Sequence, residues 1–64
     1  MANWKIGSAV MCTKDYSNSM KQGTKGVIIE EFGMMSYNWV ISYRDGAEKV
    51  TIRGEDMDKF FALI

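Results

Sequence analysis

The chain has no histidine and only one cysteine, Cys12, among its 64 residues. A single cysteine cannot form an intramolecular disulfide, and without histidine a structural zinc site is close to excluded. The usual general base near neutral pH is also missing. We therefore expect no enzyme, no metal and no cofactor. A domain this small must be held together by a closed core or by oligomerisation.

The formal net charge is zero, so the composition indicates no global attraction to nucleic acid. No apolar h-region follows the N-terminus, and no apolar run approaches the ~20 residues of a membrane helix. A cysteine without a partner fits a reducing compartment. We expect one domain over residues 1–64, cytoplasmic and without a membrane partner, of a size that would suit a phage or mobile-element gene.

Glycines and alternating apolar residues divide the chain into short strands. The pair Asp45-Gly46 predicts a hairpin turn, because both residues tolerate positive φ. Residues 17–23 are polar and predict a flexible loop, and residues 54–59 fit one short helical turn. Strands are expected over residues 8–16, 27–32, 37–44, 48–53 and 60–64. This order predicts an all-β fold, a five-stranded SH3-like barrel with one short helical turn before the last strand.

The two-residue period of a strand assigns side chains to the core. Val10, Cys12 and Ile28 are expected to point inward, with Cys12 acting as a small hydrophobe rather than a nucleophile. Glu30 and Glu31 are adjacent, so one of them would face the core of a regular strand; a β-bulge or strong bend would resolve this conflict. Further expected alignments are Tyr37, Trp39, Ile41 and Tyr43 on one face of the third strand, and Val50 and Ile52 inward on the fourth.

Several of these segments resemble the SH3-like barrel superfamily. Gly23-x-x-Gly26-x-Ile28 is similar to the glycine-led second strand of KOW-type barrels. Trp39-x-Ile41-x-Tyr43-x-Asp45-Gly46 is similar to their third strand and hairpin. Such barrels host many unrelated functions, so the resemblance implies a fold and no single activity.

Within that superfamily the pattern also resembles the type II dihydrofolate reductases, tiny tetrameric barrels. These enzymes line a shared pore with a Val-Gln-Ile-Tyr segment, and the matching segment here reads Val50-Thr51-Ile52-Arg53. The ligand-binding glutamine and tyrosine are absent. The resemblance implies an oligomeric pore-type enzyme as one alternative, or the assembly mode without the activity. The chain is also similar to the small barrel subunit that serves as a docking protein at the stromal side of photosystem I.

Apolar residues crowd the segment between the second and third strands. Two adjacent methionines at a turn are hard to bury together in a small core, and methionine with aromatics at an exposed tip suits an adaptable interface. We predict a non-catalytic protein-binding or assembly module, with self-association into a homo-oligomer, whose interface residues are Met34, Met35, Tyr37 and Trp39. The other interpretation is that this hairpin folds over the open end of its own barrel.

A nucleic-acid-binding barrel is the alternative function. Four residues around the first loop could contact phosphate and stack a base: Lys14, Tyr16, Lys21 and Lys25. A solvated loop is the competing interpretation. The acidic residues Glu55, Asp56 and Asp58 lack the spacing of a calcium loop and predict a solvated turn.

Overall fold

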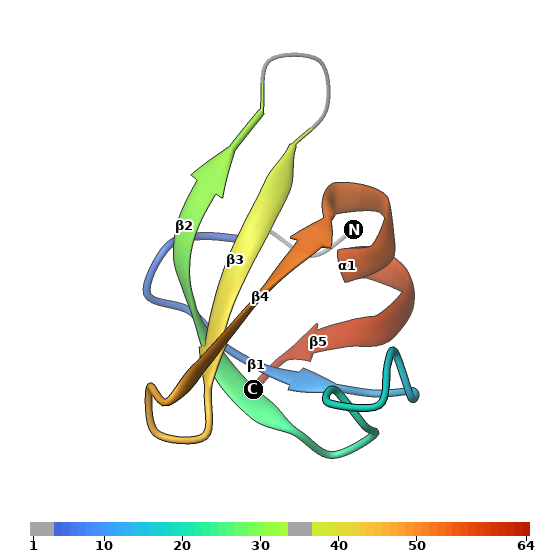
Figure 1. The fold of residues 1–64 in the computed structure, drawn as a ribbon. Helices are drawn as coiled ribbons and strands as arrows, with labels where there is room; N and C mark the ends of the chain where they lie inside the picture. Colours follow the sequence, from blue (N-terminus) through green and yellow to red (C-terminus); the bar gives the residue numbers. More distant parts are fainter. Residues whose placement is uncertain (1–3, 34–36) are drawn as a thin grey trace.

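The structure is a computed structural model that describes residues 4–33 and 37–64. Within these residues the chain forms five strands and one helix, confirming the expected all-β class with one short helical segment (Figure 1). The elements are β1 Ala9–Cys12, β2 Lys25–Phe32, β3 Asn38–Tyr43, β4 Glu48–Arg53, α1 Gly54–Phe60 and β5 Phe61–Leu63.

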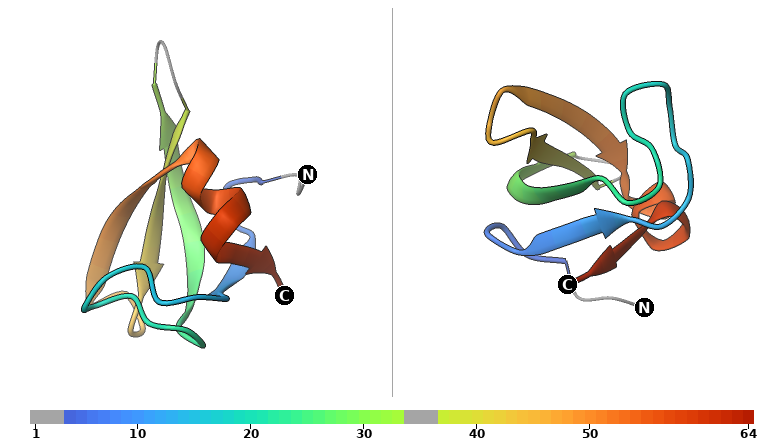
Figure 2. Two further views of the ribbon diagram at one scale, coloured as in Figure 1. Left: turned by 90° about the vertical axis from the view of Figure 1, so that its right-hand side faces the viewer. Right: turned by 90° about the horizontal axis from the view of Figure 1, so that it is seen from below.

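The strands form one antiparallel sheet in the order β4-β3-β2-β1-β5. Strands β4 and β5 lie at the two edges, and no ladder joins them within the described part of the chain. Figures 1 and 2 show the sheet bending over on itself, with α1 placed between the end of β4 and the start of β5. The core lies between the two halves of this bent sheet and under the helix.

The core confirms the inward assignments made from alternation. Val10, Cys12 and Ile28 are fully buried. The conflict at Glu30 and Glu31 is resolved as expected, because the pairing of β2 with β3 shifts register between Ile28 and Glu30 and leaves both carboxylates exposed. The remaining members of the core are Met20, Trp39, Ile41, Tyr43, Ile52, Met57 and Phe61.

The first strand is shorter than expected, and the loop after it is not simply polar. Strand β1 ends at Cys12, so its expected continuation to residue 16 is wrong. Beyond Cys12 the chain makes a tight turn in which the amides of Tyr16 and Ser17 both donate to the Met20 carbonyl, at 2.8 and 3.2 Å. This turn directs Met20 into the core, where it is 1% exposed.

Tyr37 does not share the core face of β3, which corrects the expected alignment. It precedes the strand and is 66% exposed, whereas Trp39 is 8% exposed and packs in the core. The Gly54 amide donates to the Tyr37 carbonyl at 2.7 Å, and a Cβ on Gly54 would lie 2.9 Å from that oxygen. Tyr37 is therefore held by its backbone against the start of α1, at the end of the sheet.

The β3–β4 connection is a tight hairpin, as the Asp45-Gly46 pair predicts. Arg44, Asp45 and Gly46 all have positive φ, at 53°, 55° and 88°. The predicted fourth strand, 48–53, matches β4. No helix in the described residues is long and apolar enough to cross a membrane.

Candidate functional site

The outer face of the sheet carries a row of small and apolar side chains. Ala9 pairs with Val27, and Val27 pairs with Ser42, so these three residues from β1, β2 and β3 lie on the face opposite Ile28. Ile29, from the irregular step in β2, lies beside them. The Ile64 amide donates to the Ala9 carbonyl at 3.2 Å, which places the last residue next to the same row.

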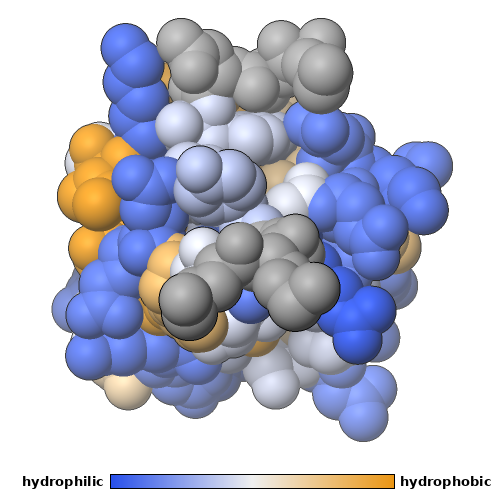
Figure 3. Space-filling view, turned by 90° about the horizontal axis from the view of Figure 1, so that it is seen from above, coloured by the Kyte–Doolittle hydropathy of each residue, from blue (hydrophilic) through white to orange (hydrophobic). Residues whose placement is uncertain are grey.

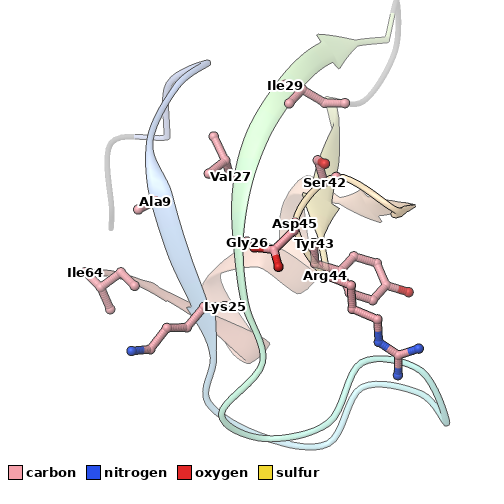
Figure 4. A pocket seen from close by; sticks show the side chains of 11 residues that line it. Ala9, Lys25, Gly26, Val27, Ile29, Ser42, Tyr43, Arg44, Asp45 and Ile64 are labelled. Carbon is pink, nitrogen blue, oxygen red and sulfur yellow. The ribbon is translucent and has the colours of Figure 1, made fainter.

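These side chains line an open hollow of about 460 Å³ (Figure 4). Val27 is 41% exposed and Ile64 is 60% exposed, although both are large and aliphatic. Val40 on β3 is also buried, although it does not belong to the core cluster. We call Ala9, Val27, Ile29 and Ile64 the outer apolar surface.

Charged residues of both signs border the outer apolar surface. Figure 4 shows Lys25 on the β1 side of β2, and Arg44 and Asp45 on the β3 side. Arg44 pairs with Glu48 at 3.0 Å. The other ion pairs among the described residues are Lys21–Asp15 and Arg53–Glu55, so Lys25 and Asp45 have no ionic partner within that part of the chain.

The predicted hairpin interface is only partly represented in the structure. Met34 and Met35 lie outside the described residues. Tyr37 is exposed, but Trp39 is buried, so the two aromatics do not present one common surface. Phe32, 51% exposed at the end of β2, adds apolar area near this end. Figure 3 views the hairpin end, and its coloured residues are mostly hydrophilic with smaller orange patches.

The predicted nucleic-acid residues do not converge as free groups. The Tyr16 hydroxyl donates to Asp56 Oδ2 at 3.1 Å, and its ring packs edge-on against Phe60 with centroids 5.0 Å apart. The Tyr16 side chain is therefore half-buried and engaged by α1. Lys21 lies 3.9 Å from Asp15. Lys14 and Lys25 are exposed, but Lys25 borders the outer apolar surface instead of joining a basic patch.

Two of the acidic side chains of α1 accept hydrogen bonds from neighbouring segments. Asp56 accepts the Tyr16 hydroxyl, and Asp58 accepts the Trp4 indole N–H at 3.1 Å. Glu55 and Asp58 are exposed, as expected for a solvated turn, whereas Asp56 is half-buried. The two hydrogen bonds connect α1 to the first 16 residues. No group of three or more candidate metal ligands occurs in residues 4–33 and 37–64.

Cys12 is enclosed, as expected for a structural cysteine. Its side chain has no exposed surface, and its thiol donates to the Lys14 carbonyl with an Sγ–O distance of 2.7 Å. Burial raises the pKa of the Cys12 thiol. The neutral thiol is therefore the stable form, and a thiolate nucleophile is disfavoured at this position.

Sequence reasoning missed the outer apolar surface, although a signal for it was present. Ile28 was assigned to the core, so Val27 and Ile29 had to lie on the other face. Two large aliphatic residues on the solvent side of one strand are such a signal. The contribution of Ile64 depends on the pairing of β5 with β1, which a single strand pattern does not reveal. Comparison of the chain with family models, with curated proteins and with solved structures gives no match.

Proposed function

We propose that this protein is a non-catalytic protein-binding and assembly module that associates with itself. The observation that carries the proposal is the outer apolar surface, in which Val27 and Ile64 remain exposed beside Ala9 and Ile29. Exposed apolar area on a small domain is typical of a site that a protein partner covers.

The arrangement of elements supports a relation to SH3-like barrels. The meander β2–β3–β4, the short helix and the final strand beside β1 follow the expected order. Helix α1 lies between the two sheet edges, which is where a barrel of this type would close. Proteins with this architecture serve mainly as scaffolds for sites on their surfaces, so the function must be argued from the surface.

The chemistry of the described residues also favours binding over catalysis. The single cysteine is enclosed, and the carboxylates of Asp56 and Asp58 accept hydrogen bonds from Tyr16 and Trp4. In the segment of this chain that matches the pore-lining strand of the reductases, Ile52 lies in the core. Thr51 and Arg53 are exposed on an edge strand. A binding surface made of aliphatic side chains needs none of these groups.

Light scattering over a range of protein concentrations tests the proposal. We expect a mass above the 7.3 kDa of one chain, with dissociation on dilution. Val27→Ser should shift the transition to higher concentration without changing the circular dichroism spectrum. Phe32→Ser is the matched control, because it removes a similarly exposed apolar side chain at the hairpin.

A mass of 7.3 kDa at every concentration would overturn self-association. If Phe32→Ser disrupts assembly and Val27→Ser does not, the hairpin is the interface, as the sequence predicts, and the outer apolar surface is not.

A further inference from the structure

We propose that two copies pack through their outer apolar surfaces about a two-fold axis, with Lys25 of each copy paired with Asp45 of the other. This inference rests on the proposed function and specifies its partner, a second copy of the same chain, and its geometry. It also draws on a second observation, which is that Lys25 and Asp45 border this surface without an ionic partner among residues 4–33 and 37–64.

The position of the two charges is what selects a symmetric partner. Figure 4 shows Lys25 on the β1 side of strand β2 and Asp45 on its β3 side, near Gly26. A two-fold axis through this central region exchanges the two sides, so each lysine faces the aspartate of the other copy. A two-fold interface is self-complementary in this way, and both ion pairs form together.

The same border is unsuited to a strongly charged foreign partner. Lys25 and Asp45 have opposite sign, and Arg44 is paired with Glu48. A polyanion would be attracted by Lys25 but repelled by Asp45, whereas a second copy satisfies both. The chain has a formal net charge of zero, so two copies also approach without long-range repulsion.

A two-fold contact of this kind would cover only part of the surface of each chain. An interface of standard size takes about 800 Å² from each partner. That area is less than a fifth of the 4400 Å² that one chain exposes. The outer apolar surface would form the centre of the contact and the charged residues its rim, which is the usual distribution in protein interfaces.

Charge reversal in complementary variants tests the geometry. In a dimer of the Lys25→Glu variant, each introduced glutamate faces Asp45 of the other copy. In a dimer of the Asp45→Lys variant, each introduced lysine faces Lys25 of the other copy. Each variant should raise the dimer dissociation constant by about tenfold or more, because like charges across an interface are strongly disfavoured. An equimolar mixture of the two variants should form a heterodimer with affinity near that of the wild type, because both pairs are restored.

Two controls separate this geometry from general electrostatics. Lys14→Glu changes the net charge as Lys25→Glu does but does not border the surface, so its dimer should be unaffected. Lys25→Glu mixed with Glu31→Lys carries the same opposite net charges as the test mixture, but its heterodimer restores only one of the two pairs and keeps one repulsion, so its affinity should stay below that of the wild type. Circular dichroism checks each fold, since lysine at position 45 must adopt a φ of 55°.

The outcomes distinguish the two proposals. If the wild type dimerises but the complementary mixture does not recover affinity, the Lys25–Asp45 geometry is overturned and the assembly function stands. If the wild type is monomeric throughout, both are overturned. If the affinity recovers in the complementary mixture but not in the control mixture, the symmetric dimer is supported.

Discussion

The Tyr16 hydroxyl donates a hydrogen bond to Asp56 Oδ2 across 3.1 Å, and the two residues are 40 positions apart in the chain. This contact joins the turn after β1 to helix α1. The edge-on packing of Tyr16 against Phe60 and the hydrogen bond from Trp4 to Asp58 reinforce the same junction. The junction stabilises the region between the edge strands β4 and β5, where no backbone ladder joins the two edges in the described residues.

Tyr16→Phe tests the hydrogen bond at this junction. Removing the hydroxyl leaves the ring contact with Phe60 in place, and we expect a loss of about 1 kcal/mol in the free energy of unfolding. Tyr16→Ala should cost more, because it also removes the aromatic contact. Urea unfolding provides the measurement, with Tyr37→Phe as the control at an exposed position. Equal effects of the two Tyr→Phe variants would contradict the role of Tyr16.

Alkaline pH should destabilise the fold through the same residue. Burial, and then the hydrogen bond to Asp56, raises the pKa of Tyr16 above its ordinary value of 10.0. The neutral phenol is thus favoured by folding. Its contribution is complete below the ordinary value and is lost as the pH rises through the higher folded value.

The stability advantage of the wild type over Tyr16→Phe should therefore shrink between neutral pH and about pH 11. Burial, followed by Glu48, also raises the pKa of Tyr43, so the wild type alone would report both groups. The comparison with Tyr16→Phe isolates Tyr16. A constant difference across this range would show that its ionisation is not coupled to folding.

Met20 should be among the core positions where substitution lowers stability most, although its neighbours in the sequence are polar. It is 1% exposed and fills space next to β1. Met20→Ala should cost about 2–5 kcal/mol by leaving a cavity, whereas Met20→Leu should cost less than about 1.5 kcal/mol. Urea unfolding of both variants measures the difference. A small effect of Met20→Ala would place this side chain outside the core.

Gly26 should not accept a side chain, because the neighbouring strand approaches too closely. A Cβ at this position would lie 2.6 Å from Ile41 Cγ2 and 2.7 Å from the Ser42 carbonyl oxygen. We expect Gly26→Ala to lower the melting temperature, at a cost of about 1–3 kcal/mol. Thr51→Ala, at an exposed strand position, is the control. An unchanged melting temperature for Gly26→Ala would contradict this packing.

The Cys12 thiol should react with a disulfide reagent only after the fold opens. It has no exposed surface, and burial raises its pKa, so both access and thiolate formation are limited. Native protein should react much more slowly than protein in urea, and Cys12→Ala provides the blank. Equally fast reaction of native and unfolded protein would contradict the enclosed position.

The sequence by itself determined the elements that depend on local pattern. The alternation around Ile52 and the Asp45-Gly46 turn predicted β4 and its hairpin, because a strand period and a positive φ are local requirements. Adjacent Glu30 and Glu31 predicted the irregular step in β2, because neither carboxylate can be buried without cost. The burial of Cys12 followed from its alternation with Val10.

The positions of residues that depend on contacts with distant parts of the chain were decided only by the tertiary structure. Tyr16 lies in a predicted strand and a predicted nucleic-acid site, but Asp56 and Phe60 from α1 engage it. Met20 is buried because a turn after β1 aims it inward, and Ile64 reaches Ala9 because β5 pairs with β1. Local patterns carry no information about such distant partners. The sequence signal at Val27 and Ile29 is local, but the pairing that sets Ala9 and Ile64 beside them depends on tertiary structure.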